Sequence, residues 1–462
     1  MLQAELTNWS KSACSQCFTY KASDVSEILR GLDLARLQHL SVIPHGAGHS
    51  YTDAALNTSG VVIDVTPMRR ILSWDPVRGI MRVEPGVTLR EMVQMAWQDG
   101  WWPYVTPSTP AVTIGGCAAM NVNGKNAWKY GPFGGHILSM DVLLTSGEIC
   151  TLEPDWDPQL FHAFVGSLGL LGILTSITVQ LQRIYSGYVT IHRRSAASLA
   201  EIFELFAEEE PRSDYMEAWM DGLAEGEQFG RGMITCARLI EAGNAVPGPF
   251  STPAKLARLE TSLFNIAGRL GRPVLQPGVQ FVNHAIYQWG CWGPKTDRRQ
   301  ALPRFTFWPS AAFGGYHSMF PQGAETFHAF VPGQHANDIF EGVLRYSQQQ
   351  NCFPIWCIIK QHRHDPFLLT YQVDGFSLEL NYQRTPQMAH KLKQVLQHMI
   401  AIVVEGGGRF YLAKDHFLTH DQYRRSVGGE VVDTFLELKQ HYDPEMLLQS
   451  DLFRRIFLPD QR

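Results

Sequence analysis

Three glycine-bearing passages in the first half of the chain constrain its fold more than any other feature. They read HGAGHSY at 45–51, TIGGCAAMNVNGKN at 113–126 and GSLGLLGI at 166–173. Glycine backbones can form tight turns and approach phosphate oxygens closely, because no Cβ stands in the way. Taken singly, each passage is expected to be a structural turn, since glycine is common in turns. Together they predict short elements joined by tight loops that can also receive a ligand.

Neither a mononucleotide loop nor a dinucleotide fingerprint is present among these passages. The pattern G-x-x-x-x-G-K-[ST] does not occur, and the third glycine of G-x-G-x-x-G is missing after Gly48. The sequence therefore disfavours NAD binding by a Rossmann unit. It also lacks G-x-S-x-G, so a serine hydrolase has no support.

Charge and cysteine content disfavour several other classes of protein. The 462 residues carry 39 basic and 44 acidic side chains, a net charge of −5, without the basic stripe typical of duplex nucleic-acid binders. Eight scattered cysteines are too few for a disulfide framework, and the lone C-x-x-C of Cys14 and Cys17 is weak evidence for zinc. We therefore expect no nucleic-acid partner, no metal and a reduced, cytoplasmic location, with peripheral membrane contact left open.

A signal peptide and a membrane-spanning helix are not expected either. The N-terminal MLQAELTNWSKSA has no basic region followed by an apolar run. Residues 158–182 contain no Lys, Arg, Asp or Glu, and a spanning helix needs about 20 mainly apolar residues. This stretch instead changes from a helical pattern through a glycine-rich turn to a β-branched strand pattern, so it is expected to be buried.

The spacing of apolar residues predicts an α+β fold for the first part of the chain. A helix is expected after Ser23, at its N-cap, and another is expected to bury one apolar face. That face comprises Leu89, Met92, Val93, Ala96 and Trp97. Short strands, each ending in glycine, proline or a turn, are expected at 40–46, 60–68, 79–88 and 140–153.

The rest of the chain changes character twice. Residues 187–240 mix strands and helices, whereas 241–304 are rich in glycine and proline and are expected to be irregular. Long irregular segments are often functional lids, so 241–304 are expected to form a lid that admits a long or lipid-like substrate. Near the end, a helix of about four turns is expected to stop at Asp443, before Pro444.

Order and spacing of these passages give the chain a family resemblance. The first part of the chain resembles the FAD domain of the vanillyl-alcohol oxidase (PCMH-type) superfamily. The resemblance lies in a short strand followed by PHGAGHSYTDAAL, VVIDVTPM, TPSTPAVTIGGCAAMNVNGKN and GSLGLLGIL, in this order. Three further segments look like the decaprenylphosphoryl-β-D-ribose 2′-oxidase branch: NGKNAWKYGPFGGHILSMDVLLTSGE, GGGRFYLAKD and YDPEMLLQSDLFRR. The resemblance implies an FAD-binding domain over 1–185, a substrate domain on an antiparallel sheet over 186–404, and a C-terminal segment, 405–462, that completes the flavin site.

The resemblance also assigns roles to individual residues. It implies that the first loop cradles the FAD pyrophosphate, that a later stretch lines the flavin, that Ile173 contacts the adenosine side and that Tyr411 lies beside the isoalloxazine. The implied cofactor-binding residues are His45, Gly46, Ala47, Gly48, His49, Ser50, Thr109, Gly115, Asn121, Asn123, Gly124, Ile173 and Tyr411. The implied catalytic residues are Lys414, Lys125 and Tyr51, and the substrate candidates are Phe307, His328, Lys360 and Glu379.

Three positions depart from the sugar-oxidase pattern. Asn123 replaces a flavin-side histidine, Glu379 aligns with a pocket cysteine, and Phe307 aligns with a pocket tyrosine. His328 aligns with a pocket glutamine. These changes bear on the substrate and count against the polyprenyl-sugar of that branch.

Lys414 and His49 each admit two interpretations. A lysine desolvated beside a flavin can favour the reduced state or accept a hydroxyl proton, whereas on local sequence alone Lys414 is a solvated neighbour of Asp415. His49 sits in a G-x-G-H-S loop like that of superfamily members with an 8α-histidyl flavin. It is expected either to bond the flavin covalently or to be a neutral histidine near the phosphates.

The remaining histidine pairs give weaker signals. His416 and His420 are four apart and could share a helical face, but no H-E-x-x-H supports a metal. His362 and His364 are at strand spacing and are expected at a solvated strand end.

The sequence thus predicts a two-domain flavoprotein with one FAD per chain. We expect it to oxidise a hydroxyl carbon of a carbohydrate or glycosyl-lipid alcohol, with hydride passing to flavin N5. The alternatives are a soluble alditol- or aldonolactone-type oxidase, which His49 favours, and a flavin-binding subunit without turnover. A reductase partner is left open.

Overall fold

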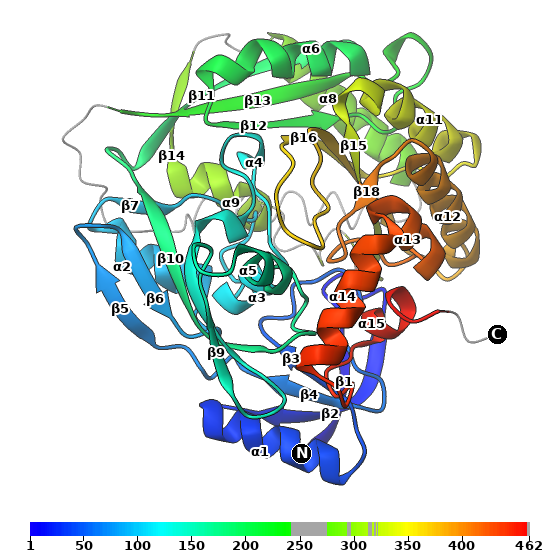
Figure 1. The fold of residues 1–462 in the computed structure, drawn as a ribbon. Coiled ribbons are helices and arrows are strands. Elements are labelled where there is room, and N and C mark those ends of the chain that lie inside the picture. The colour runs from blue at the N-terminus through cyan, green and yellow to red at the C-terminus, as the bar shows by residue number, and fades with distance from the viewer. Residues whose placement is uncertain (242–274, 293–296, 313–316, 318–319, 321, 460–462) are drawn as a thin grey trace.

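The computed structural model describes all residues except 242–274, 293–296, 313–316, 318–319, 321 and 460–462. Its described residues form three β-sheets with helices packed between and around them (Figure 1). The first two sheets come from the N-terminal 183 residues, and the third comes from the middle of the chain.

The first sheet is small and mixed. Its strand order is β1 (Leu2–Thr7), β2 (Cys14–Lys21), β4 (Val61–Asp64) and β3 (Val42–His45). β1 and β2 are antiparallel, whereas β4 runs parallel to both β2 and β3. Because β3 ends at His45, the first glycine passage begins where this sheet ends.

The second sheet is antiparallel and is built around the long strand β10. The order is β5 (Ile71–Asp75), β6 (Ile80–Val83), β10 (Ile173–Arg183), β8 (Ile137–Leu143) and β9 (Ile149–Leu152), with β7 (Trp101–Pro103) also on β10. The expected change from helix to strand across 158–182 is confirmed, since α5 (Pro158–Phe164) precedes β10.

The third sheet is fully antiparallel and has eight described strands. Their order is β14 (Arg298–Ala301), β11 (Tyr188–Ala196), β13 (Gly232–Leu239), β12 (Tyr215–Met220), β16 (Trp356–His362), β17 (Gly375–Gln383), β15 (Ala324–Pro332) and β18 (Arg409–Phe410). Helices α6 (Leu199–Glu209), α11 (Ala336–Gln349) and α12 (Ala389–Glu405) pack on this sheet (Figure 1).

The helices of the first part follow from local sequence signals. In α2 (Leu89–Trp97), Thr88 and Glu91 form a reciprocal capping box, and the five predicted apolar residues are buried. In α1 (Val25–Leu37), the N-cap is Asp24 rather than the expected Ser23, because the Asp24 side chain accepts a hydrogen bond from the N–H of Glu27. Short helices α3 (Ile114–Ala119) and α4 (Ala127–Tyr130) interrupt the second glycine passage.

The C-terminal segment returns to the first sheet. After α13 (His420–Val427), the predicted four-turn helix α14 (Gly429–Tyr442) is confirmed, and α15 (Asp451–Ile456) follows. The N–H of Val42 donates to Leu447 O, and the N–H of Gln449 donates to Val42 O. These bonds bring residues more than 400 positions apart into contact, which is visible in Figure 1 where α14 and α15 lie beside β3.

One expectation about secondary structure is wrong. Residues 275–304 are not irregular, because they contain α8 (Leu275–Trp292), β14 and the start of α9 (Leu302–Ala312). Pro277 falls in the first turn of α8, where its missing N–H costs no hydrogen bond. The rest of the expected lid, 242–274, lies outside the described residues.

Helices combined with mainly antiparallel sheets agree with the predicted α+β class. The division into domains at 185 and 404 stays a prediction.

Candidate active site

A cavity of 1510 Å³ lies between the glycine passages and the third sheet. Its wall includes the loop after β3, the segments 106–125 and 168–174, the loop 411–414, and residues of α8. The opposite wall is one face of the third sheet. The three glycine passages, which are separate in the sequence, therefore meet at one cavity.

Glycine is required sterically in the first passage. A Cβ on Gly46 would lie 2.3 Å from Thr113 Oγ1, and Gly48 has a φ of +66°, in the left-handed region. Within the described residues, the backbone N–H groups of 46–50 donate to no protein acceptor, whereas the N–H of Tyr51 donates to Ala413 O at 2.8 Å. This loop therefore presents free donors to the cavity, as a phosphate-binding turn does.

The second passage lines the cavity with its backbone and a polar cluster. Gly115 and Gly124 lie so close to Pro85 and to Thr106 O that an added Cβ would come within 2.6 and 2.8 Å of them. Asn123 Nδ2 donates to the Tyr371 hydroxyl at 3.2 Å. These contacts fix the passage against the third sheet's connecting loop.

The sheet wall of the cavity is formed by alternate residues of five strands, since alternate side chains share one face of a sheet. Trp219 lies opposite Ile358, which lies opposite Glu379. The residues on this wall are Arg193, Glu217, Trp219, Met233, Thr235, Trp356, Ile358, Lys360, Glu379, Asn381 and Gln383.

Lys414 and Glu379 form a buried ion pair on this wall. Lys414 Nζ donates to Glu379 Oε2 at 2.5 Å, and it also lies 5.0 Å from the centre of the Tyr51 ring. Burial alone would raise the pKa of Glu379, but Lys414, together with His328 and Lys360, outweighs burial and holds that pKa well below its usual range. Burial lowers the pKa of Lys414; Glu379 opposes this shift and Lys360 adds to it.

His328 lies directly opposite Glu379 in the sheet, so the two side chains share one face, but His328 does not line the cavity. It is 1% exposed, and neither ring nitrogen has a hydrogen-bond partner within the described structure. Burial, with a further effect of Lys414, lowers its pKa well below the usual value, so the ring is neutral. A neutral imidazole can carry its proton on either Nδ1 or Nε2, and a change from one form to the other leaves the net charge beside the ion pair unaltered.

Lys125 forms a second buried pair near the other end of the wall. Its Nζ lies 2.8 Å from Glu217 Oε1 and donates to Phe305 O at 3.2 Å. The backbone N–H of Met216 in turn donates to Lys125 O. Lys125 therefore ties the second glycine passage to β12.

His49 lines the cavity and stacks on an aromatic ring. Its ring centre lies 4.2 Å from that of Trp9, and Nδ1 has no hydrogen-bond partner within the described residues. Burial lowers its pKa, with a further effect of His317, so the imidazole is neutral and has a free nitrogen. Both interpretations of His49 require a neutral ring.

The structure brings most of the predicted site residues together. Those that line the cavity are His45, Gly46, Ala47, Gly48, His49, Ser50, Tyr51, Thr109, Gly115, Asn123, Gly124, Lys125, Ile173, Lys360, Glu379, Tyr411 and Lys414. Asn121, Phe307 and His328 are buried and are not part of this lining. Phe307 packs against Trp102, and Asn121 accepts hydrogen bonds from the N–H of Gly134 and from the Tyr371 hydroxyl.

Two expectations about histidines are wrong. His362 is not at a solvated end but is 1% exposed, with Nε2 2.9 Å from Ser377 Oγ, because the following loop folds back over the strand. His416 and His420 do not share a helical face, since α13 begins at His420. His416 instead lies beside the buried pair of Asp53 and Arg455.

Sequence reasoning missed Glu217, Arg193 and Tyr371. Glu217 lies between two buried neighbours on β12, so strand alternation was the available signal for it. Arg193 lies between two half-buried neighbours on β11, and burial does not mark it. Tyr371 lies in a loop between β16 and β17, where no periodicity marks it.

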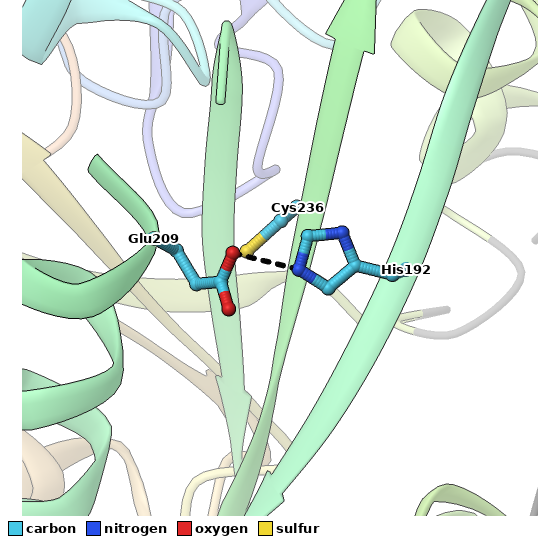
Figure 2. Close-up of side chains that lie close together, drawn as sticks. All are labelled: His192, Glu209 and Cys236. Carbon is cyan, nitrogen blue, oxygen red and sulfur yellow. Dashed lines mark hydrogen bonds and ion pairs between the residues drawn. The ribbon is translucent and has the colours of Figure 1, made fainter. Parts of the chain in front are cut away.

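A second cluster lies on the opposite face of the third sheet (Figure 2). The side-chain atoms of His192, Glu209 and Cys236 that could bind a metal ion lie within 4.8 Å of one another, and His192 Nε2 is 2.8 Å from Glu209 Oε2. Arg194 and Arg212 also pair with Glu209, at 3.0 and 3.4 Å. Burial raises the pKa of Cys236 to about 12. Two guanidinium groups and a protonated thiol disfavour the binding of a metal cation at this cluster. We therefore interpret the cluster as structural.

Comparison with known proteins identifies the class of the site. The FAD binding domain family matches residues 18–153. Decaprenylphosphoryl-beta-D-ribose oxidase of Mycolicibacterium smegmatis is 26% identical, covering 98% of this chain and 97% of the relative. The chain is an FAD-linked oxidoreductase. L-gulonolactone oxidase of Mus musculus is 27% identical, over 38% of this chain and 40% of the relative. D-lactate dehydrogenase of Anaerostipes hadrus is 29% identical, over 35% of each.

The predicted resemblance to FAD-linked oxidases, the enzyme class and the cofactor are thus confirmed, and a flavin-binding subunit without turnover is disfavoured. The cavity of the oxidoreductase fits FAD, because its first loop offers free N–H donors and contains glycines at which a side chain would clash or strain the backbone. Among the described helices, none is both long and apolar enough to cross a membrane.

Proposed function

We propose that this oxidoreductase oxidises a hydroxyl-bearing carbon of a carbohydrate or glycosyl-lipid alcohol. Support comes from the alignment over nearly the whole chain with an enzyme named for its oxidation of decaprenylphosphoryl-β-D-ribose. The shorter matches to lactone and hydroxy-acid enzymes share the same coarse chemistry at a hydroxyl carbon.

The observation that carries the proposal is the buried pair of Lys414 and Glu379 on the cavity wall. Bound FAD supplies a hydride acceptor. The hydroxyl proton of the substrate passes to Lys414 Nζ in its neutral amine form, and burial favours that form because it lowers the pKa of the ammonium. Glu379 orients Nζ through the 2.5 Å hydrogen bond, and Lys360 supplies a further positive charge on the same wall.

The glycine passages would hold the cofactor. In this proposal the loop 45–50 binds the pyrophosphate through its free N–H groups, and Ile173 lies at the adenosine side. Thr109, Gly115, Asn123, Gly124 and Tyr411 line the flavin. Asn121 acts behind the lining, through Gly134 and Tyr371. Residues 1–185 and 405–462 then form the FAD domain, and 186–404 form the cap that carries the sheet wall.

The alternative is an alditol- or aldonolactone-type oxidase, and one observation favours it. His49 is neutral, faces the cavity and keeps Nδ1 free, which a bond to the flavin 8α-methyl requires. The electron acceptor, a reductase partner and peripheral membrane contact stay predictions.

Anaerobic bleaching of the flavin tests the proposal. The purified holoenzyme is mixed without oxygen with a prenyl phosphoryl ribofuranose, an alkyl ribofuranoside, xylitol and L-gulono-1,4-lactone, and absorbance near the flavin maximum is followed. Bleaching by either ribofuranose supports the proposal, and bleaching by xylitol or the lactone alone supports the alternative. A flavin that none of these compounds reduces contradicts both.

A further inference from the structure

Arg193 is a cation on the sheet wall of the cavity that lies apart from Lys414 and Lys360, the two lysines that lower the pKa of Glu379. It lies on β11 and lines the cavity, and its side chain forms no ion pair or hydrogen bond with the described residues. By contrast, Lys414 pairs with Glu379, and Lys125 pairs with Glu217. Arg193 is therefore a cation that faces the cavity without a carboxylate of its own.

The surroundings of Arg193 keep it in place without neutralising it. Its guanidinium carbon lies 5.0 Å from the centre of the Trp289 ring, on α8. The sequence of α8, LQPGVQFVNHAIYQWGCW, contains no Asp or Glu that could pair with it. Burial and the nearby Arg298 lower the pKa of Arg193, and Glu217 only partly opposes them. A bound anion would compensate this cost.

The position of Arg193 relative to the ion pair defines where such an anion would lie. Arg193 is opposite Thr235, and Thr235 is opposite Glu217, so these side chains share the cavity face. From β11 to β17, which carries Glu379, there are four strand spacings, or about 19 Å. A substrate group held by Arg193 would therefore lie remote from the reacting hydroxyl.

We propose that Arg193 binds an oxyanion, a phosphate or carboxylate, carried by the substrate at the end remote from the carbon that is oxidised. The planar guanidinium fork matches such a group with two parallel hydrogen bonds. The inference rests on the proposed function, since it assumes that the cavity holds the alcohol substrate. It makes Arg193 a determinant of substrate class, which is an alcohol with a negative charge at some distance from its hydroxyl.

Calorimetric titration of the holoenzyme tests Arg193 without requiring turnover. The probes are octyl phosphate, octanoate and the neutral octyl glucoside, which separate the two anion chemistries from the effect of the alkyl chain. Arg193→Gln removes the charge, Arg193→Lys keeps the charge without the fork, and Arg238→Gln is the matched control. Arg238 lies on the neighbouring strand and points to the opposite face of the sheet from Thr235, toward a second, smaller cavity of 760 Å³ that Arg193 also borders.

We expect wild type to bind at least one of the two anions. Arg193→Gln should weaken that binding about 10- to 100-fold, as for a charged hydrogen bond, and Arg193→Lys should weaken it less. Octyl glucoside binding and the Arg238→Gln variant should be nearly unchanged. The proposal is overturned if wild type binds neither anion, if Arg193→Gln binds it as tightly as wild type, or if all three probes weaken alike.

The same variants separate this inference from the proposed function. If an alcohol bleaches the flavin, the anion that binds should inhibit that reaction competitively in wild type and not in Arg193→Gln. Non-competitive inhibition places the anion outside the substrate cavity and overturns the inference, while the proposed function stands. If no alcohol bleaches the flavin, the proposed function fails, and the titration alone decides whether Arg193 binds an anion.

Discussion

Replacing Lys414 with methionine removes the Nζ atom that lies 2.5 Å from Glu379 Oε2 and keeps the length of the side chain. Two unit charges at this distance attract by about 7 kcal/mol at an effective dielectric constant of about 20, and desolvation offsets part of this energy. The side chains of Lys414 and Glu379 are 19% and 11% exposed, so solvent screens the pair weakly. Removing one partner of such a pair costs about 3–5 kcal/mol of unfolding free energy, because the other charge stays buried.

Lys414→Met should lose turnover as well as stability. A positioned proton-transfer group contributes on the order of 10² to 10⁴ in rate, and we expect a loss of that size with FAD retained. The double variant Lys414→Met/Glu379→Gln removes the orphaned charge, so it should recover much of the stability and none of the turnover. Steady-state oxidation rates and urea unfolding followed by flavin fluorescence measure the two effects separately.

The pH dependence gives an independent check. Glu379 has a folded pKa below its unfolded value, so its pairing stabilises wild type above about pH 4.5, and that stability is lost as the pH falls. In Lys414→Met the buried carboxyl has lost its principal cation, and its stability deficit should shrink as the pH is lowered. Lys393→Met, at an exposed position on α12, is the control. A wild-type rate in Lys414→Met, or turnover restored in the double variant, would refute the reasoning.

Three further predictions concern the loop and the buried acid next to the pair. Gly46→Ala should lose FAD, measured by absorbance, because its Cβ would lie 2.3 Å from Thr113 Oγ1. Gly135→Ala should keep FAD, since no atom lies within 4 Å of the added Cβ. Equal flavin contents in the two variants would contradict the role of the loop 45–50 in binding FAD. If His49 bonds the flavin, acid-precipitated protein stays yellow and His49→Ala releases its FAD; release of all FAD by wild type excludes the bond. Burial raises the pKa of Asp415 from 3.8 to about 6. Wild type should therefore lose up to about 3 kcal/mol of unfolding free energy as the pH rises from 4 to 6, and Asp415→Asn should not. Parallel pH profiles of the two proteins would show that the pKa of Asp415 is not raised.

The sequence by itself determined the features that depend on neighbouring residues. The apolar face and capping box of α2, the helix-to-strand change before β10 and the stop of α14 at Asp443 each follow from residues within a few positions. The glycine passages also follow from local chemistry, since a tight loop with free N–H groups needs residues without a Cβ. Resemblance then extended these loops to an FAD cavity, which the matched domain supports.

Only the tertiary structure decided which charges meet at the cavity. Lys414 and Glu379 are 35 residues apart, and Lys125 meets Glu217 where the N–H of Met216 on β12 donates to Lys125 O. The register of the sheet also places Arg193 on the cavity face and His328 beside Glu379. Side chains in an antiparallel sheet find their partners across strands that are distant in the chain, so no local spacing could have predicted these contacts.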